Sequence, residues 1–549
     1  MSVDLTSLAK RLEALDTSDT TRARYARLTV PWPLDAPSDA AGHGGFFTPI
    51  GVVHPDSEAD LEAIVAFARA HRLPLHPISR GRNWGYGSAA PAAPGALVVD
   101  LGRMNRILEF DDTLGYVVIE PGVSQGQLQA WLAQNAPDWW MDANGAGPDA
   151  SIVGNILERG FGHTELGERA NHFCGLRVLL GNGRFVEGGF AAYPHCRTKY
   201  TYRHGLGPSL DGLFLQSSFG IVSRMAIWLR KRPIAFGAFF CMASSPRDLP
   251  RLIDAIAELK RQGIVRSTVH VGNRLRALSA MPYPWASTAP RTPVSETWLD
   301  QAAQTFGLGA YTATGSVSGT EEMVASALAH VKAVLADFAV QTFREADLAA
   351  LASRAEAPDT PADEKARLQR FLSVAAPAFG LLQGKQTDVY LKGAGWRSRH
   401  AQPGISDPLE MKAGLAWLVP TLPAKGEEAA RVEHLLTQIF AAHGFDTPLT
   451  FSFVNERTLI CTSNIYFDRD DPKDAANAAR CHEVALARLL EEGYLPYRMT
   501  PGASGALRRD DGTWWLLDQL KTLCDPDGIL SPGRYVDARR DGSTEGRSK

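Results

Sequence analysis

Two glycine-rich segments, each next to a strand-like run, lie within the first 165 residues and constrain the fold most strongly. The first is SRGRNWGYG at 79–87, and the second is SIVGNILERGFG at 151–162. Glycine lets backbone N–H groups approach a ligand because no Cβ stands in the way, and successive N–H groups in such turns can cradle a pyrophosphate. Neither segment has the GxGxxG or GxxxxGK[ST] spacing of the common phosphate-binding loops, so an ordinary tight turn is the alternative for either segment alone.

Regular elements are predicted around these segments from capping residues and hydrophobic periodicity. Ser57 with Asp60 three positions later is typical of a helix N-terminus, and the apolar positions of 61–68 fall on one helical face. Strands are predicted at 73–78, 96–101, 116–122, 416–420, 450–453 and 459–467, a hairpin at 176–188, and a strand pair around Gly220 within 217–229. Helical patterns dominate after Pro233, which indicates a second structural unit there.

Composition and charge exclude several classes of protein. The 57 Lys and Arg residues and 60 Asp and Glu residues leave a net charge of -3, which gives no general attraction for nucleic acid. The six cysteines form no CxxC motif, and no His, Asp or Glu cluster has metal-ligand spacing, so we expect neither a metal site nor a disulfide framework. The chain has no apolar stretch of about 18 residues. Its first residues have no basic start followed by an apolar run, so we expect a cytoplasmic protein without a membrane partner.

Five segments occur in an order that is more specific than any one of them. They are PISRGRNWGYG (77–87), IEPGV (119–123), SIVGNILERGFGH (151–163), GLFLQSSFGIVSRMAIWL (212–229) and DPDGILSPGRY (525–535). Together they resemble the vanillyl-alcohol oxidase and 4-cresol dehydrogenase family of FAD-dependent oxidoreductases, over about residues 46–535. The resemblance implies a two-domain α+β fold, in which an α/β FAD-binding domain carries an inserted cap domain of antiparallel sheet with flanking helices.

The resemblance also divides the chain. It implies an N-terminal helical lead at 1–45, an FAD-binding domain at 46–235, a cap domain over the substrate at 236–498 and a return to the FAD-binding domain at 499–537. Residues 538–549 carry almost no apolar side chain and are expected to form a flexible tail. The change of pattern after Pro233 agrees with the implied start of the cap domain.

The resemblance implies FAD as the cofactor and assigns residues to it. The residues implied to bind the pyrophosphate are Ser79, Arg80, Gly81, Arg82, Asn83 and Gly85. Ser151, Gly154 and Asn155 are implied to lie along the cofactor, and Ile221 and Val222 are implied to lie near its adenine side. Arg534 is implied near the N1–C2 edge of the flavin, where a cation stabilises the negative charge of the reduced ring.

A covalent link between protein and flavin is not expected. The histidine that tethers flavin in vanillyl-alcohol oxidase aligns with Leu415, and the tyrosine that tethers it in 4-cresol dehydrogenase falls near Asp407. No tyrosine lies between 391 and 465, and His400 is the nearest candidate to replace the tether. The sequence therefore predicts noncovalent FAD.

The resemblance further implies a clamp for a phenolate. Tyr86 matches the first of two tyrosines, Tyr497 and Arg498 match the second tyrosine and an arginine, and Thr450 matches a threonine that faces the substrate. Donors that converge on one oxygen lower the pKa of a bound phenol and hold its anion. That favours hydride transfer from the para Cα to flavin N5 and gives a quinone methide. The alternatives are a buried ring with a satisfied hydroxyl for Tyr86 and a surface strand for the Tyr-Arg pair.

Two departures from the family leave the catalytic base open. The acidic residue near flavin N5 aligns with Ala146, and Asp149 could replace it only if the loop is rearranged. His163 stands where the family usually has a tyrosine. It could act as an acid or base near the flavin, or it could be a hydrogen-bond donor that fills the space of the tyrosine.

The predicted function is FAD-dependent oxidation at Cα of a 4-substituted phenol or a phenol-like aromatic compound. The product would be dehydrogenated or hydroxylated, and the electron acceptor would be oxygen or an electron-transfer protein. Two alternatives stay open: a tailoring oxidase of the same fold on a larger, non-phenolic biosynthetic intermediate, and a flavin-binding electron-transfer subunit that needs a partner. The resemblance also implies a homodimer.

Overall fold

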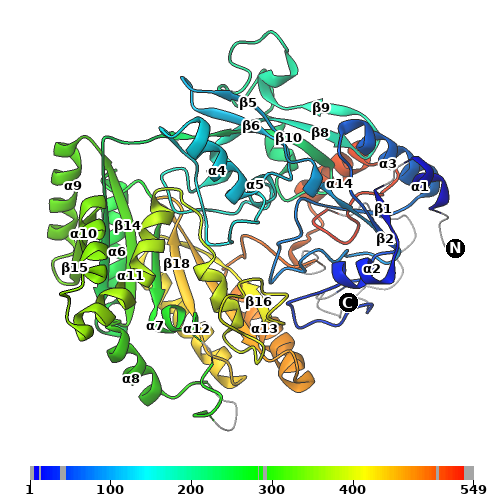
Figure 1. The fold of residues 1–549 in the computed structure, drawn as a ribbon. Helices are drawn as coiled ribbons and strands as arrows, with labels where there is room; N and C mark the ends of the chain where they lie inside the picture. Colours follow the sequence, from blue (N-terminus) through cyan, green and yellow to red (C-terminus); the bar gives the residue numbers. More distant parts are fainter. Residues whose placement is uncertain are drawn as a thin grey trace.

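Three main β-sheets organise the computed structural model, which describes residues 5–11, 14–36, 45–281, 283–288, 293–501 and 506–536 (Figure 1). The first sheet has the order β1 (Leu15–Asp16), β2 (Gly51–Val53), β4 (Leu97–Asp100) and β3 (Leu75–Ile78), and only β1 is antiparallel to its neighbour. The helix α3 (Glu58–His71) connects β2 to β3, because parallel strands need a crossover. Ser57 accepts a hydrogen bond from the Asp60 N–H and caps α3, which confirms the predicted helix start.

The second sheet is antiparallel and lies beside α4 (Gln125–Asn135) and α5 (Ile152–Leu157). Its strand order is β5 (Ile107–Asp111), β6 (Tyr116–Ile119), β10 (Gly220–Trp228), β8 (Phe173–Leu180) and β9 (Phe185–Glu187). The pair β8–β9 confirms the predicted hairpin. The strand pair predicted around Gly220 is wrong, because β10 runs unbroken between β6 and β8. A Cβ at Gly220 would lie 2.4 Å from Val178 Cγ1, so this glycine permits close strand packing and makes no turn.

The third sheet is antiparallel throughout and belongs to the later part of the chain. Its strand order is β15 (Ala339–Arg344), β12 (Ala235–Ala243), β14 (Tyr311–Gly319), β13 (Val269–Asn273), β18 (Leu449–Phe453), β19 (Thr458–Phe467) and β16 (Gly414–Leu418), with β17 (Thr421–Pro423) also on β19. Four helices contribute apolar side chains to the core that covers one of its faces: α6 (Leu249–Arg261), α9 (Glu321–Val334), α12 (Gly426–Ala442) and α13 (Pro472–Glu491). The strands predicted around 416–420, 450–453 and 459–467 are confirmed.

The remaining elements connect these sheets or lie at their edges. They are α1 (Thr6–Arg11), α2 (Asp19–Tyr25), the ribbon of β7 (Trp139–Trp140) with β11 (Arg230–Lys231), α7 (Arg274–Leu278), α8 (Glu296–Phe306), α10 (Glu345–Glu356), α11 (Ala362–Leu382) and α14 (Gly512–Cys524). No helix among the described residues is long and apolar enough to cross a membrane. The predicted tail at 538–549 lies outside the described residues.

The two faces of the third sheet differ in chemistry at its centre. Val269 and Val271 of β13 and Phe451 and Phe453 of β18 are fully buried in the core against the helices. The alternate positions pair His270 with Ser452 and Gly272 with Thr450 across the same two strands. Because side chains alternate between the faces of a strand, these polar and small residues share the opposite face. This second face supplies polar groups to the site described below.

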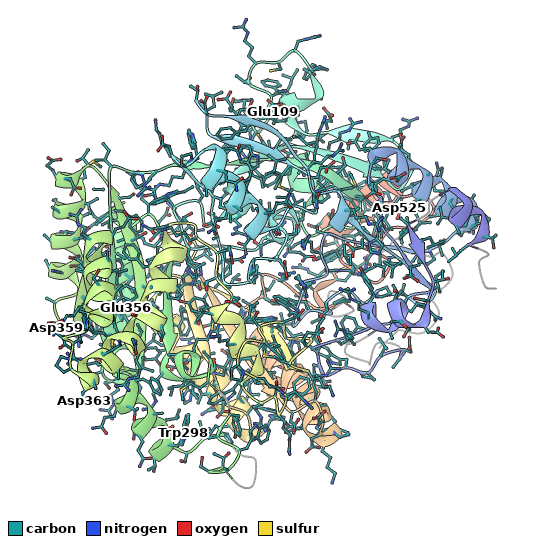
Figure 2. All side chains as sticks on the ribbon, viewed as in Figure 1. Glu109, Trp298, Glu356, Asp359, Asp363 and Asp525 are labelled. Atoms are coloured by element: carbon teal, nitrogen blue, oxygen red, sulfur yellow. The ribbon has the colours of Figure 1, made fainter. Side chains whose placement is uncertain are left out.

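A buried ion pair fixes the C-terminal return of the chain. Lys521 of α14 lies 2.7 Å from Asp525, whose two oxygens also accept the backbone N–H groups of Ile529 and Leu530. Leu530 then forms a bridge to Leu75 of β3. Asp525 accordingly lies deep among the first and second sheets, where the red C-terminal segment meets the blue and cyan elements (Figures 1 and 2). This anchor carries residues 531–535 to the site.

A buried histidine beside this segment makes stability dependent on pH. Burial, with a smaller effect of Arg534, lowers the pKa of His76 on β3 to about 3. Between pH 7 and pH 5 the unfolded chain takes up a proton at this position and the folded chain does not, so folded stability falls as pH falls, by about 2 kcal/mol for this group. Between pH 7 and pH 5, the free energy of unfolding should therefore fall by about 2 kcal/mol less in His76→Leu than in the wild type. Urea unfolding of both proteins at pH 7 and pH 5 measures this, and equal losses would contradict it.

Candidate cofactor and substrate site

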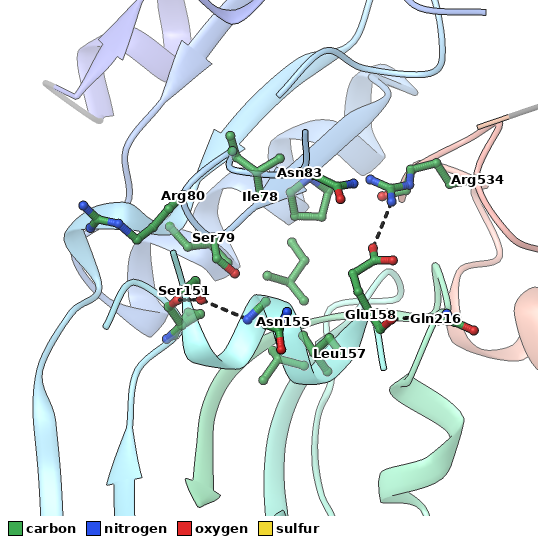
Figure 3. Close-up of a pocket in the computed structure, with 18 of the residues that line it drawn as sticks. Ile78, Ser79, Arg80, Asn83, Ser151, Asn155, Leu157, Glu158, Gln216 and Arg534 are labelled. Atoms are coloured by element: carbon green, nitrogen blue, oxygen red, sulfur yellow. Dashed lines mark hydrogen bonds and ion pairs between the residues drawn. The ribbon is translucent and has the colours of Figure 1, made fainter. Parts of the chain in front are cut away.

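An elongated cleft opens between the first sheet, the start of α5 and the C-terminal segment, with a void of about 1210 Å³ that includes its open side (Figure 3). Eleven of the predicted cofactor residues line it: Ser79, Arg80, Gly81, Arg82, Asn83, Ser151, Gly154, Asn155, Ile221, Val222 and Arg534. They come from four segments far apart in the chain. The structure therefore brings these residues together around one cleft.

The loop after β3 presents backbone donors to this cleft. None of the four N–H groups from Arg80 to Asn83 donates to an acceptor among the described residues, although all four residues line the cleft. Gly81 has φ +65, a conformation that favours glycine. Unpartnered N–H groups in succession are suited to bind phosphate oxygens. The loop thus fits the pyrophosphate of a dinucleotide.

The start of α5 approaches this loop as closely as glycine allows. The Ser151 side chain caps α5 by accepting the Gly154 N–H at 2.9 Å, and its own hydroxyl donates to the Pro121 carbonyl at 2.7 Å. A Cβ on Gly154 would lie 2.9 Å from Ser79 Oγ and 3.2 Å from Ser79 Cβ. The absence of a side chain at Gly154 therefore lets the start of α5 pack in contact with the loop after β3.

Gly85 lies outside the lining of this cleft, unlike its neighbours in the loop. Its φ is +73, and a Cβ there would lie 1.8 Å from Trp417 of β16. Its N–H donates to Thr29 Oγ1 at 2.8 Å. The glycine is thus required by close packing against the third sheet, and the structure gives it no direct place beside the pyrophosphate.

Glu158, which the sequence analysis did not single out, joins the two arginines of the site. Its carboxylate lies 3.0 Å from Arg498 Nε and 2.9 Å from Arg534, and Figure 3 shows Glu158 and Arg534 pointing toward each other. Burial raises the pKa of Glu158, but the two guanidinium groups outweigh burial and hold the pKa below its ordinary value. The carboxylate therefore stays ionised and leaves the cluster one net positive charge.

Tyr86, Tyr497 and Arg498 meet beside the cleft. The Arg498 guanidinium lies 4.4 Å from the centre of the Tyr86 ring and also donates to the Asn83 side chain. Tyr86 and Tyr497 pack in one apolar cluster with Val419, which lies between β16 and β17. The buried Tyr86 hydroxyl makes no hydrogen bond of ordinary geometry to a described residue. Burial raises the pKa of both tyrosines, so their hydroxyls stay protonated and can donate.

Aromatic and imidazole rings continue from Tyr497 along the polar face of the third sheet. The Phe161 ring lies 6.0 Å from Tyr497 and 6.1 Å from His270, and His163 lies 4.1 Å from His270. Burial lowers the pKa of His163 to about 3, so it is neutral at physiological pH. A pKa this low disfavours His163 both as an acid and as a base near neutral pH, which favours the alternative interpretation of a hydrogen-bond donor in the place of the tyrosine.

A buried ion pair holds this ring-bearing loop in place. Arg169 Nε lies 2.6 Å from Asp142, whose other oxygen accepts the N–H and hydroxyl of Thr164. Arg169 also donates to Asn155 of α5 at 2.8 Å. One arginine thus ties a residue of the cleft to the loop that carries His163.

The residues weighed as a base or a tether have other partners. Asp149 is exposed and lies 3.7 Å from Arg80 and 3.5 Å from Arg82, whereas Ala146 lines the cleft with no acid in its place. Leu415 is buried among apolar side chains, and Asp407 pairs with Arg82. His400 lies 2.6 Å from Asp470 and is half-exposed.

Comparisons with known proteins agree with this geometry. A family model described as an FAD binding domain matches residues 49–189. Over 493 residues the chain is 34% identical to 1'-carboxy-chondrochloren decarboxylase of Chondromyces crocatus, and the matched region covers 88% of this chain and 90% of that protein. It is 27% identical over 503 residues to the flavoprotein subunit of 4-cresol dehydrogenase of Pseudomonas putida, and the matched region covers 91% of this chain and 89% of that protein. The chain belongs to the vanillyl-alcohol oxidase and 4-cresol dehydrogenase family. It is an FAD-dependent enzyme, and FAD is its cofactor.

Solved structures of this family share the fold over nearly the whole chain. The crystal structure of p-cresol methylhydroxylase with substrate bound matches 98% of this chain and 97% of its own, with a TM-score of 0.83 and 25% identity. The 4-ethylphenol oxidase from Gulosibacter chungangensis has a TM-score of 0.84 at 23% identity. The predicted two-domain α+β flavoprotein fold is confirmed. The domain boundaries and the roles of single site residues stay predictions.

The residue at position 415 bears on how FAD is held. Leu415 itself has no nucleophilic atom that could bond the flavin, so we expect the cofactor to be noncovalent. Acid precipitation of the yellow protein should release the flavin into the supernatant. Flavin fluorescence that stays with the denatured protein band on a gel would contradict this, and mass spectrometry of the band would then locate the link.

Proposed function

We propose that the enzyme removes a hydride from Cα of a 4-substituted phenol. The observation that carries this proposal is the meeting of Tyr86, Tyr497 and Arg498 beside the cleft, where the buried Tyr86 hydroxyl makes no hydrogen bond of ordinary geometry to a described residue. Leaving a buried hydroxyl without a partner costs about 1–3 kcal/mol, so a ligand oxygen at this point would satisfy it. A phenolate is such a ligand and also matches the positive charge of Arg498.

In this proposal each group has a role on the substrate oxygen. The two protonated tyrosines donate hydrogen bonds to it, and Arg498 supplies the charge that favours the phenolate over the phenol. Bound FAD supplies the acceptor for the hydride that leaves Cα. Electron density from the phenolate assists that departure and leaves a quinone methide, to which water can add at Cα.

Anaerobic mixing with a matched pair of probes tests the proposal. 4-Propylphenol should bleach the flavin absorbance, whereas 4-propylanisole should not, because its methylated oxygen cannot form a phenolate. Equal bleaching by both would favour the tailoring oxidase that acts on a non-phenolic substrate. Bleaching by neither would favour the electron-transfer subunit. Reoxidation by air after bleaching would assign oxygen as the acceptor, and its failure would assign an electron-transfer protein.

The relative from Chondromyces crocatus favours a second candidate, oxidative decarboxylation of a biosynthetic intermediate. After hydride loss from Cα, a carboxylate on the neighbouring carbon would leave as CO₂. The electron pair of the breaking C–C bond would form the new C=C bond and restore the phenolate, which regains its proton from water. Overall, the substrate loses a hydride from Cα and CO₂ from its carboxylate group. With 3-(4-hydroxyphenyl)propanoate the products would be CO₂ and 4-vinylphenol, whereas hydroxylation would leave the carboxylate in place.

A further inference from the structure

Arg276, in the short helix α7 after β13, differs from the other arginines around the site. Its Nη1 donates to the Tyr466 hydroxyl at 3.3 Å and lies 3.5 Å from Ser279 Oγ, and both partners are neutral and buried. No carboxylate of a described residue lies within ion-pair distance of it. Arg274, two residues earlier on the same helix, pairs with both Glu296 and Asp300.

Arg276 is partly buried, and its guanidinium packs against buried groups. A Cβ on the buried Gly393 would lie 3.0 Å from its Nη1 and 3.3 Å from the Tyr466 hydroxyl. The side chain leaves the sheet at Gly272, where a Cβ would lie 3.7 Å from Arg276 Cγ and 3.8 Å from Thr450 Oγ1. Arg276 therefore starts on the polar face of the third sheet, beside the threonine expected to face the substrate.

The same face connects Arg276 with the proposed phenolate clamp. Its charge acts on His270 and on Tyr390, a residue of the segment 389–395, and the His163 ring lies 6.4 Å from Tyr390. His163 and His270 are surrounded by protein and yet keep part of their accessible surface. Contacts between neighbouring rings lead from Tyr497 past the two histidines to Tyr390, on which the charge of Arg276 acts.

A partly buried guanidinium without a carboxylate partner loses part of its hydration, and no opposite charge replaces it. Desolvation of the charge is offset here only by bonds to neutral groups. A planar guanidinium is also the group best suited to bind a carboxylate through two parallel hydrogen bonds. An anionic ligand at this position would supply the partner that the chain itself does not.

We propose that Arg276 binds a carboxylate on the para side chain of the substrate, so that the substrates are 4-hydroxyphenyl compounds that carry a carboxylate. The inference rests on the proposed function, because it assumes that the phenol oxygen lies at Tyr86, Tyr497 and Arg498. The two arginines would then hold the two ends of one molecule. Cα would lie between them, along the wall formed by Phe161 and His270.

Two probes of equal chain length test this, 3-(4-hydroxyphenyl)propanoate and 4-propylphenol. The wild-type holoenzyme should show the higher kcat/KM for flavin reduction by the propanoate. Arg276→Met keeps the length of the side chain and removes the charge, and it should lower kcat/KM for the propanoate by about tenfold to a hundredfold. The same variant should leave 4-propylphenol unchanged. Arg276→Lys should recover part of the preference because it restores the charge without the bidentate geometry.

Arg274→Met is the matched control, since it removes a paired arginine from the same helix. It should not alter the ratio of the two probes. Flavin content is measured for each variant, and Arg276→Gln, which also removes the charge, replaces Arg276→Met in the comparison if the latter does not hold FAD. A wild-type enzyme without preference for the propanoate, or a preference that survives Arg276→Met, overturns the inference while the proposed function stands. If neither phenol reduces the flavin, the proposed function fails and the inference falls with it.

Discussion

Replacing Arg498 by alanine should lower kcat/KM for a 4-substituted phenol about a hundredfold. A hydrogen bond to a charged group contributes about 1.5–3 kcal/mol, which corresponds to roughly tenfold to more than a hundredfold. We expect the upper end because Arg498 is the only fixed positive charge among the three clamp residues. The pH profile should also move toward alkaline pH, since the intrinsic pKa of the phenol would then govern formation of the phenolate. Anaerobic flavin reduction across pH 6–10 measures both effects.

Controls and one further variant, Tyr86→Phe, separate chemistry from structure in this experiment. Arg498→Ala also leaves Glu158 with Arg534 as its one remaining arginine, so flavin content and thermal stability are measured alongside. Tyr86→Phe removes a hydroxyl that makes no hydrogen bond of ordinary geometry to a described residue, so it should cost little stability. It should nevertheless lower kcat/KM about tenfold. Unchanged reduction rates in both variants with full flavin would show that no phenolate is held there, and a non-phenolic substrate would then be favoured.

Local signals predicted much of the fold. The capping residue Ser57, the hairpin around Gly181-Asn182-Gly183 and the later strands were predictable because each depends on neighbours in sequence. Gly220 was misinterpreted because a glycine that allows close strand packing and a glycine in a turn give the same local pattern. Only the partner strand β8 distinguishes the two cases.

The site was predictable where a motif could be matched and not where charge balance decides. Glu158 lies in a recognised segment, but its importance comes from Arg534, which is 376 residues away in sequence. Gly85 stands in the predicted pyrophosphate loop, yet its contact is Trp417 of the third sheet. Arg276 belongs to no motif. Its interest arises from the absence of a carboxylate among the described residues around it, which no local sequence pattern can show.

Gly154→Val should abolish most FAD binding while the protein stays folded. The added Cβ would lie 2.9 Å from Ser79 Oγ and 3.3 Å from Ser151 Oγ, so the loop after β3 and the start of α5 would have to move apart. Overpacking of this kind costs about 1–3 kcal/mol. If the strain is relieved only by displacing the unpartnered N–H groups of 80–83 from the phosphates, affinity for FAD should fall by roughly tenfold to a hundredfold. Reconstitution of apoprotein with FAD, followed by flavin fluorescence, gives the dissociation constant.

Gly212→Val is the matched control for this substitution. Gly212 belongs to the same part of the chain, but a Cβ there meets nothing within 4 Å, and Gly212 does not line the cleft. It should bind FAD as the wild type does. Circular dichroism of both apoproteins should match that of wild-type apoprotein, which would show that the loss at Gly154 comes from the cleft and not from unfolding. Wild-type affinity in Gly154→Val would mean that the two segments can separate without losing the cofactor, and the proposed pyrophosphate site at 80–83 would have to be abandoned.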